Sequence, residues 1–282
     1  MREVEADEMA PLGAEYDYPP FGKFFETKLL QPTIYYFLLW RALACLVRKY
    51  LWKDYSGFRK YRLCNLTICF LHSFFTGSAA LIFFFARTRV LFEETIHWWD
   101  DSCAHVFLCS IGYFIHDTLD MLSNEWSKWM IELLFHHTLT IIIFLVQLTS
   151  QRFQPYAFWV LLMEVSSAFL HARSLLQISG VGDRNSKFFR GFLWSNVIVF
   201  IVFRFCVQTW QMWWILGNGE RMMHFYYCVG FYGGIVFLTI NAFLFYRVLA
   251  SDGFLGEKRR TAMPSRENQT FTKSNTQLKK NK

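Results

Sequence analysis

The chain is organised by long apolar runs that alternate with short polar segments. Seven runs read as membrane-spanning helices, because each is long and apolar and ends at charged or turn-forming residues. They cover about Thr33–Val47, Leu63–Ala86, Ser102–Leu122, Trp126–Leu148, Tyr156–Ile178, Phe192–Leu216 and Met222–Leu249. The pattern predicts an all-α, multi-pass membrane protein with about seven transmembrane helices.

Composition agrees with this class. Of the 282 residues, 54% are hydrophobic, 20% are aromatic and only 18% are charged. A soluble domain of this length carries more charge and fewer aromatic residues. The seven cysteines form no CxxC pair and fall mostly inside apolar runs, so we expect buried thiols and not a disulfide framework.

The polar segments divide the chain into four parts. Residues 1–32 are acidic and proline-rich and are predicted to be non-globular. Residues 33–60 hold the first span and a basic loop, and residues 61–252 hold six further spans. Residues 253–282 form a basic tail with too few apolar residues to fold alone.

The distribution of basic residues predicts an orientation. Eighteen Lys and Arg residues fall on one side of the predicted spans and seven on the other. The positive-inside rule then places the C-terminus in the cytosol and the N-terminus outside. We therefore assign the net charge of +7 to topology and to attraction of the tail to anionic lipid, and we expect no nucleic-acid partner. The plasma membrane is the expected location, with the endoplasmic reticulum as the alternative; the sequence does not define an oligomeric state.

Ionisable residues inside the apolar runs mark the candidate site, because charge at membrane depth needs a partner or a function. The third run holds His116, Asp117 and Asp120, which helical spacing predicts to share one sector. The fourth holds His136 and His137, which are adjacent and cannot face the same way. One of them is expected to enter a cavity and the other to contact a neighbour. The later runs add Glu164, His171, Arg173, Arg204 and Asn241.

Helix geometry predicts which of these residues meet. The turn after the third run is short, so the third and fourth helices should be antiparallel neighbours. A rise of about 1.5 Å per residue then places His116 or Asp117, and not Asp120, at the depth of the double histidine. Arg204 is expected to pair with Glu164 or with an aspartate of the third run. Arg173, near a helix end, is expected to extend its charged head to the cytosolic surface.

Two chemical interpretations follow. The candidate catalytic residues are His136, His137, His116, Asp117 and Asp120, with a histidine as general base and a carboxylate to orient it. The candidate lipid-binding or supporting residues are Glu164, His171, Arg173, Arg204 and Asn241. The same His and Asp residues offer ligands for zinc or iron, but HExxH spacing is absent, so no metal and no cofactor is expected.

The polar runs resemble the TLC-domain superfamily, and most closely its branch of TLC domain-containing proteins one and two. The likeness rests on Gly112–Asp120, on the double histidine, and on Leu162-Met163-Glu164-Val165-Ser166 with a following Arg173. It covers about Tyr61–Asp252. The resemblance implies six helices around a lipid cavity, preceded here by one extra span. It also implies control of phospholipid acyl composition and membrane fluidity, by limiting fluidising phospholipids with long polyunsaturated chains.

The ceramide synthases of the same superfamily suggest an acyltransferase as the alternative. Their double histidine is matched here, but their later His-Asp-x-x-Asp segment reads Met163-Glu164-Val165-Ser166-Ser167 in this chain. Only one acid is kept, which disfavours N-acylation of sphingoid bases and leaves other acyl transfers open. The sequence therefore does not decide whether the protein is an enzyme, and phospholipids or acyl chains are the expected ligands under both hypotheses.

Overall fold

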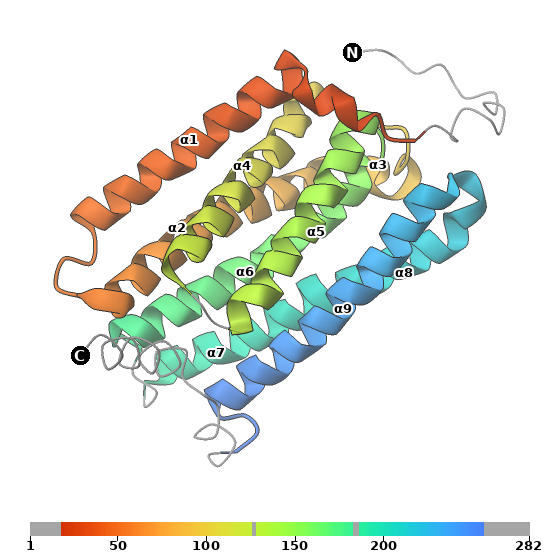
Figure 1. The fold of residues 1–282 in the computed structure, drawn as a ribbon. Coiled ribbons are helices and arrows are strands. Elements are labelled where there is room, and N and C mark those ends of the chain that lie inside the picture. Colours follow the sequence, from red (N-terminus) through yellow and green to blue (C-terminus); the bar gives the residue numbers. More distant parts are fainter. Residues whose placement is uncertain (1–17, 126–127, 183–185, 257–282) are drawn as a thin grey trace.

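The structure, a computed structural model, describes residues 18–125, 128–182 and 186–256 and contains helices but no strand in these ranges (Figure 1). A π-helix, Ile201–Cys206, joins α7 to α8 without a break, and 3-10 turns precede α1 and α9. The α-helices are α1 (Thr27–Tyr50), α2 (Gly57–Ala86), α3 (Thr88–Glu93), α4 (Asp101–Asn124), α5 (Lys128–Ser150), α6 (Gln154–Ser179), α7 (Lys187–Phe200), α8 (Val207–Asn218) and α9 (His224–Asp252).

The all-α membrane class is confirmed. Five helical segments in the described residues are long and apolar enough to cross a membrane: Thr27–Tyr50, Gly57–Ala86, Met130–Ser150, Lys187–Arg221 and His224–Asp252. Helices α4 and α6 coincide with the other two predicted spans, and α6 is longer than α5. These two helices carry most of the buried polar groups described below, which lowers their apolarity.

The long helices form one bundle. Helix α2 packs along α6, α4 along α5, and α8 along α9, while α1 lies on the outside of the bundle against α4 (Figure 1). Glycine permits the closest of these contacts. A Cβ atom added at Gly77 would lie 2.9 Å from the backbone nitrogen of Val165 in α6, and one at Gly112 would lie 2.7 Å from that of Phe37 in α1.

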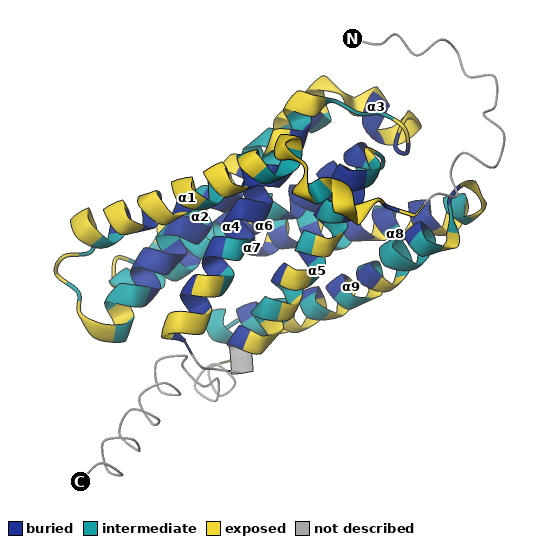
Figure 2. Cartoon of the chain, turned by 45° about the horizontal axis from the view of Figure 1, so that its top comes forward, coloured by how far each residue is buried: buried dark blue, intermediate teal, exposed yellow. Residues whose placement is uncertain are grey.

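The surface of the bundle is apolar where lipid would cover it. Figure 2 shows an exposed outer stripe along α1 and a buried interior in α4 and α6. The interior contains fully buried aromatic rings, including Phe107, Phe144 and Phe158. Large side chains on the outward faces include Leu38, Phe74, Ile82, Phe85, Trp213 and Phe243. Apolar residues on both sides of each helix are expected for a bundle solvated by hydrocarbon.

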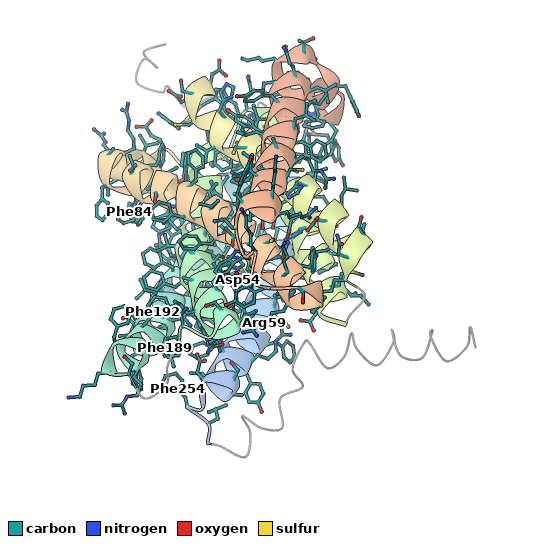
Figure 3. The ribbon with its side chains drawn as sticks, turned by 90° about the vertical axis from the view of Figure 1, so that its left-hand side faces the viewer. Asp54, Arg59, Phe84, Phe189, Phe192 and Phe254 are labelled. Carbon is teal, nitrogen blue, oxygen red and sulfur yellow. The ribbon has the colours of Figure 1, made fainter. Side chains whose placement is uncertain are left out.

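One end of the bundle, here called the basic end, contains the α1–α2 connection and the C-terminal ends of α6 and α9. Figure 3 views the molecule from the side where the α1–α2 connection lies, with Asp54 and Arg59 labelled there. Arg59 donates from Nε to the carbonyl of Ile178 at 2.9 Å, and Tyr55 donates to that of Ser179 at 2.7 Å. These bonds satisfy the last carbonyls of α6, which ends at Gly180 with a φ of +81°.

Two predictions about the chain differ from the structure. The first helix begins at Thr27 and not at Thr33, because Pro32 near its start removes only one backbone bond and is accommodated. The basic segment between the first two predicted spans is also shorter than expected, because Arg48 belongs to α1 and Arg62 to α2. The acidic residues 1–17 and most of the basic tail lie outside the described residues.

Candidate functional site

The buried polar residues form two groups. The carboxylate cluster, made of Asp117, Asp120 and Glu125 with their partners, lies toward the basic end of α4. The cavity cluster, made of His136, Glu164, Arg204 and Asn241, surrounds a small cavity between α4, α5, α6, α9 and the π-helix. Both groups lie between the helices of the bundle, but they are two groups and not the single shared site that the sequence predicted.

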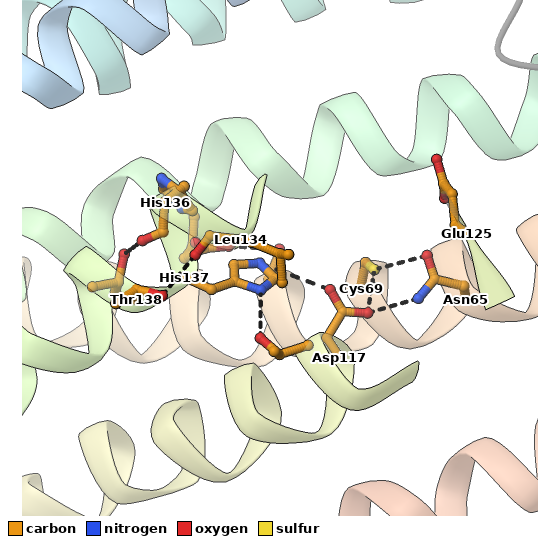
Figure 4. Close-up of polar contacts among 12 residues, drawn as sticks. Asn65, Cys69, Asp117, Glu125, Leu134, His136, His137 and Thr138 are labelled. Atoms are coloured by element: carbon orange, nitrogen blue, oxygen red, sulfur yellow. Dashed lines mark hydrogen bonds and ion pairs between the residues drawn. The ribbon is translucent and has the colours of Figure 1, made fainter. Parts of the chain in front are cut away.

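Asp117 and His137 make the contact that links α4 to α5. The Asp117 Oδ2 atom lies 3.7 Å from Nε2 of His137, and its Oδ1 atom accepts a hydrogen bond from Asn65 at 2.6 Å (Figure 4). Thr118 contacts the other ring nitrogen of His137 at 3.3 Å. The prediction that His116 or Asp117, and not Asp120, neighbours the double histidine is therefore confirmed for Asp117.

The other two carboxylates have arginine partners that sequence reasoning did not assign. Asp120, which is 3% exposed, pairs with Arg48 of α1. Glu125 is fully buried and lies 3.1 Å from Nη1 of Arg62 in α2. These pairs neutralise buried carboxylates that would otherwise be costly. The expectation that Arg204 pairs with an aspartate of this helix is wrong, because closer arginines already satisfy the acid cluster.

The three polar residues of α4 do not share one sector, which corrects the sequence-based prediction. Gly112, His116 and Asp120 are each four residues apart, and Gly112 and Asp120 both contact α1. His116 is 2% exposed, and its Nδ1 atom has no hydrogen-bond partner among the described residues. Asp117 follows His116 by one residue, about 100° around the helix, and so faces α2 and α5 instead.

His136 takes the other direction from His137, as predicted, and lines the cavity. Its ring lies 5.2 Å from that of Phe237 in an edge-to-face arrangement. The cavity has a volume of about 20 Å³, and Glu164, Arg204 and Asn241 also line it. Its remaining wall is mainly apolar: Phe114, Phe144, Val160, Leu161, Met163 and Phe237, with Thr140. An imidazole, a carboxyl group and a guanidinium thus face one small volume inside apolar walls.

Arg204 is held by neutral groups. It donates to Ser166 Oγ at 3.2 Å, to Ser167 Oγ at 2.8 Å and to the Asn241 side-chain oxygen at 2.5 Å. Glu164 accepts a bond from Ser73 at 2.6 Å and makes no ion pair within 4 Å with Arg204. Arg204 and Glu164 therefore line the same cavity but do not form the direct ion pair that was predicted. Ser167, which stands where the ceramide synthase segment has its second acid, is thus one of the three side chains that bind the guanidinium.

The π-helix at Ile201–Cys206 is the local feature that sequence reasoning missed. Its wider turn contains Arg204 and interrupts an otherwise continuous α7–α8 rod. Single π-turns within α-helices are frequent at functional sites. The only signal in the sequence was an arginine in the middle of an apolar run, which indicated a function but not a change of helix type.

Two further candidates lie toward the basic end of α6. Arg173 is 7% exposed and donates from Nε to both carboxylate oxygens of Asp252, at 2.8 and 2.7 Å, and from Nη2 to Ser251 at 2.5 Å. It does not extend to the surface, because Asp252 at the end of α9 supplies a buried partner. His171 is half-buried, two turns beyond Glu164 on the same helix. Arg173 thus joins helices of the site and does not line the cavity.

The described residues contain no group of three or more His, Cys, Asp or Glu side chains that could hold a metal ion. Asp117 is engaged by Asn65 and His137, and Asp120 by Arg48. Both carboxylates therefore already have partners within the described residues.

The fold and the intramembrane polar site define the class of the protein. A family model of the TLC domain matches residues 62–250, and the chain belongs to this family. It is 32% identical over 188 residues to TLC domain-containing protein 2 of Danio rerio, covering 67% of this chain and 75% of that protein. It is 31% identical over 172 residues to TLC domain-containing protein 1 of Gallus gallus, covering 58% of this chain and 67% of that protein. Human TLC domain-containing protein 2 is 24% identical over 216 residues, which cover 77% of this chain and 81% of that protein. Helix α1 precedes the matched region.

Proposed function

We propose that this membrane protein regulates the acyl composition of phospholipids, and with it membrane fluidity, by binding a lipid or acyl group in the cavity between α5, α6, α9 and the π-helix. In this proposal it limits the incorporation of long polyunsaturated chains that make the membrane more fluid. The observation that supports it best is the cavity lined by His136, Glu164 and Arg204 within apolar walls.

The arrangement suits an amphiphile. The guanidinium of Arg204 and the imidazole of His136 can bind the oxygen atoms of an ester or phosphate, while the aromatic walls accept hydrocarbon. Arg204 is 7% exposed, and its bonds to Ser166, Ser167 and Asn241 fix its orientation. A head group would therefore meet a preorganised donor with a low cost of reordering.

Comparative lipidomics tests the proposal. Cells with and without the protein are supplied with polyunsaturated or saturated fatty acid, and the acyl chains of phosphatidylethanolamine and phosphatidylcholine are measured. Loss of the protein should raise the polyunsaturated share, and Arg204→Met should not restore it. Glu93→Gln, on an exposed helix remote from the cavity, is the matched control and should restore it fully. Unchanged acyl profiles in all cells would refute the proposal.

The second candidate function is acyl transfer, favoured by the position of His136 in the cavity wall. The imidazole would take a proton from a hydroxyl or amine, whose oxygen or nitrogen then bonds to the acyl carbonyl carbon of a thioester or ester. The bond from that carbon to the thiol sulfur or alcohol oxygen breaks, and the leaving group takes the proton from the imidazolium. His137, held beside Asp117, would position the helix turn that carries His136.

Transfer of a labelled acyl chain by purified protein would support this second function. His136→Ala should abolish transfer, whereas Glu132→Gln on the outer face of α5 should not affect it. If His136→Ala fully restores the lipid profile of deficient cells, the histidine has no catalytic role and only the binding function remains.

We further propose that the basic end faces the cytosol, which places the N-terminus outside, with the plasma membrane favoured and the endoplasmic reticulum as the alternative. The support is the set of Lys and Arg residues around the α1–α2 connection, which positive-inside topology assigns to the cytosol. Accessibility of an epitope at each terminus in intact and permeabilised cells tests this. Labelling of the C-terminal epitope in intact cells would contradict it.

A further inference from the structure

A second cavity, here called the apolar chamber, lies between α5, α6, α8 and α9. Its volume is about 60 Å³. Most of its wall is hydrocarbon or aromatic ring, including Val146, Tyr156, Trp214, Met222 and Tyr226. No Asp, Glu, Lys, Arg or His lines it among the described residues. The chamber therefore disfavours a charged ligand, and a phosphate or carboxylate group is excluded from it on energetic grounds.

Three glutamines line the chamber, and Gln147 is the one whose amide nitrogen and oxygen are both fully buried and unpaired among the described residues. Gln147 of α5 is 2% exposed, and neither its amide nitrogen nor its carbonyl oxygen has a partner among the described residues. A buried amide that lacks partners is destabilising, so such a group needs an explanation. The neighbouring Gln208 is different, because it donates to the Gly234 carbonyl at 2.8 Å and accepts from Asn241 at 2.9 Å.

The chamber adjoins the cavity in which the proposed function places the polar head group. Val160, Met163 and Phe237 line both spaces. Gln147 follows His136 by eleven residues on the same helix, which places it roughly 16 Å further along the axis. A hydrocarbon chain whose head lies beside His136 would have to run between these shared residues to enter the chamber and approach Gln147.

We propose that the apolar chamber binds a hydrocarbon chain that carries one hydroxyl group, and that Gln147 recognises this hydroxyl. A hydroxyl donates one hydrogen bond and accepts others, so it can satisfy both the oxygen and the nitrogen of the amide without bringing charge into the chamber. The inference rests on the proposed function for the path of a hydroxylated acyl chain through the polar cavity. A long-chain alcohol that enters the chamber alone offers the same chemistry.

Binding to the purified full-length protein in detergent tests the inference. The probes are a stearic acid with a hydroxyl at mid-chain, unmodified stearic acid, and stearyl alcohol. The wild type should bind the hydroxylated acid about tenfold more tightly than stearic acid, since one satisfied buried hydrogen bond accounts for this factor. In Gln147→Leu the ratio should fall to about one. This variant should fold at least as well as the wild type, because it removes an unsatisfied amide.

Asn196→Leu is the matched control. Asn196 of α7 is also fully buried with both side-chain atoms unpaired among the described residues, but it does not line the chamber. This variant should keep the tenfold ratio. A preference for stearyl alcohol that is lost in Gln147→Leu would support a free alcohol as the ligand, and a preference for the hydroxylated acid alone would support an acyl chain.

Two results would overturn the inference and are distinguishable from failure of the proposed function. Equal affinity of the wild type for the hydroxylated and unmodified acids refutes hydroxyl recognition but leaves acyl binding intact. A preference that persists in Gln147→Leu places the recognising group elsewhere. If no acid binds but stearyl alcohol binds in a manner that depends on Gln147, the inference holds and acyl binding fails.

Discussion

The buried ion pair between Arg173 and Asp252 should contribute strongly to stability, because it joins α6 to the last residue of α9. The side chain of Asp252 has no exposed surface, and that of Arg173 is 9% exposed. Gln177 donates a further bond to Asp252 at 3.1 Å. Asp252→Ala therefore leaves a buried guanidinium without its carboxylate. Breaking a buried pair in this way costs about 3–5 kcal/mol.

A small gain reduces this loss. Asp252 is the last residue of α9, where a negative charge is unfavourable toward the helix dipole by about 0.3–1 kcal/mol. The expected net loss for Asp252→Ala is thus about 2–5 kcal/mol. Arg173→Met should lose a similar amount. The double variant Arg173→Met, Asp252→Ala should lose much less than the sum, because no unpaired charge remains.

Unfolding of the purified variants in mixed micelles, followed by tryptophan fluorescence, measures these free energies. The exposed pair Arg89–Glu93 in α3 is the control, with side chains 82% and 61% exposed. Its removal should change the free energy of unfolding by less than about 0.5 kcal/mol. The reasoning would be refuted if Asp252→Ala matched the control pair, or if the losses of the two single variants added up in the double variant.

The other predictions concern helix contacts and the site. Gly112→Ala should lower the free energy of unfolding by about 1–3 kcal/mol, because the new methyl group would overlap the α1 backbone, whereas Gly191→Ala, with nothing within 4 Å, should raise it by about 0.5–1 kcal/mol. Thermal unfolding in detergent measures both changes in the free energy of unfolding. Arg204→Lys should lose about 1–3 kcal/mol in the same assay, since one ammonium group cannot replace three directed bonds. Asp117→Asn should fold but fail to restore the acyl profile in the lipidomic assay. A full rescue would show that the charge of Asp117 is not needed for the function.

The helices were predictable because their determinants are local. Runs of apolar residues with charged ends define a span wherever they occur, so four of the seven runs (α4, α5, α6 and α9) agree with the structure to within three residues at each end, whereas α1, α2 and α7 begin five or six residues earlier than predicted. The contact between Asp117 and His137 was also predictable, since the short turn between α4 and α5 fixes the two helices relative to each other.

The arginine partners were not predictable because they depend on packing between distant segments. Arg48 and Arg62 lie beside helix ends, and charge counting treats such residues as topology signals. Only the contacts of α1 and α2 with α4 show that they neutralise Asp120 and Glu125. The unpaired amide of Gln147 was missed for a related reason. A glutamine in an apolar run carries no charge, and only the packing around it shows whether its amide has hydrogen-bond partners.

The split of the α4 motif shows why a polar residue at membrane depth is not by itself evidence of catalysis. Asp117 and Asp120 are both buried carboxylates in the segment that resembles the family. Asp117 faces the interior of the bundle and the double histidine, so its charge is available to the site. Asp120 faces α1, a helix that precedes the matched TLC domain. The charge of Asp120 is neutralised there by an ion pair with Arg48. With Gly112 on the same face, Asp120 serves to dock α1. Burial is common to both residues, and only the direction of the side chain separates the candidate for chemistry from the one that holds a neighbouring helix.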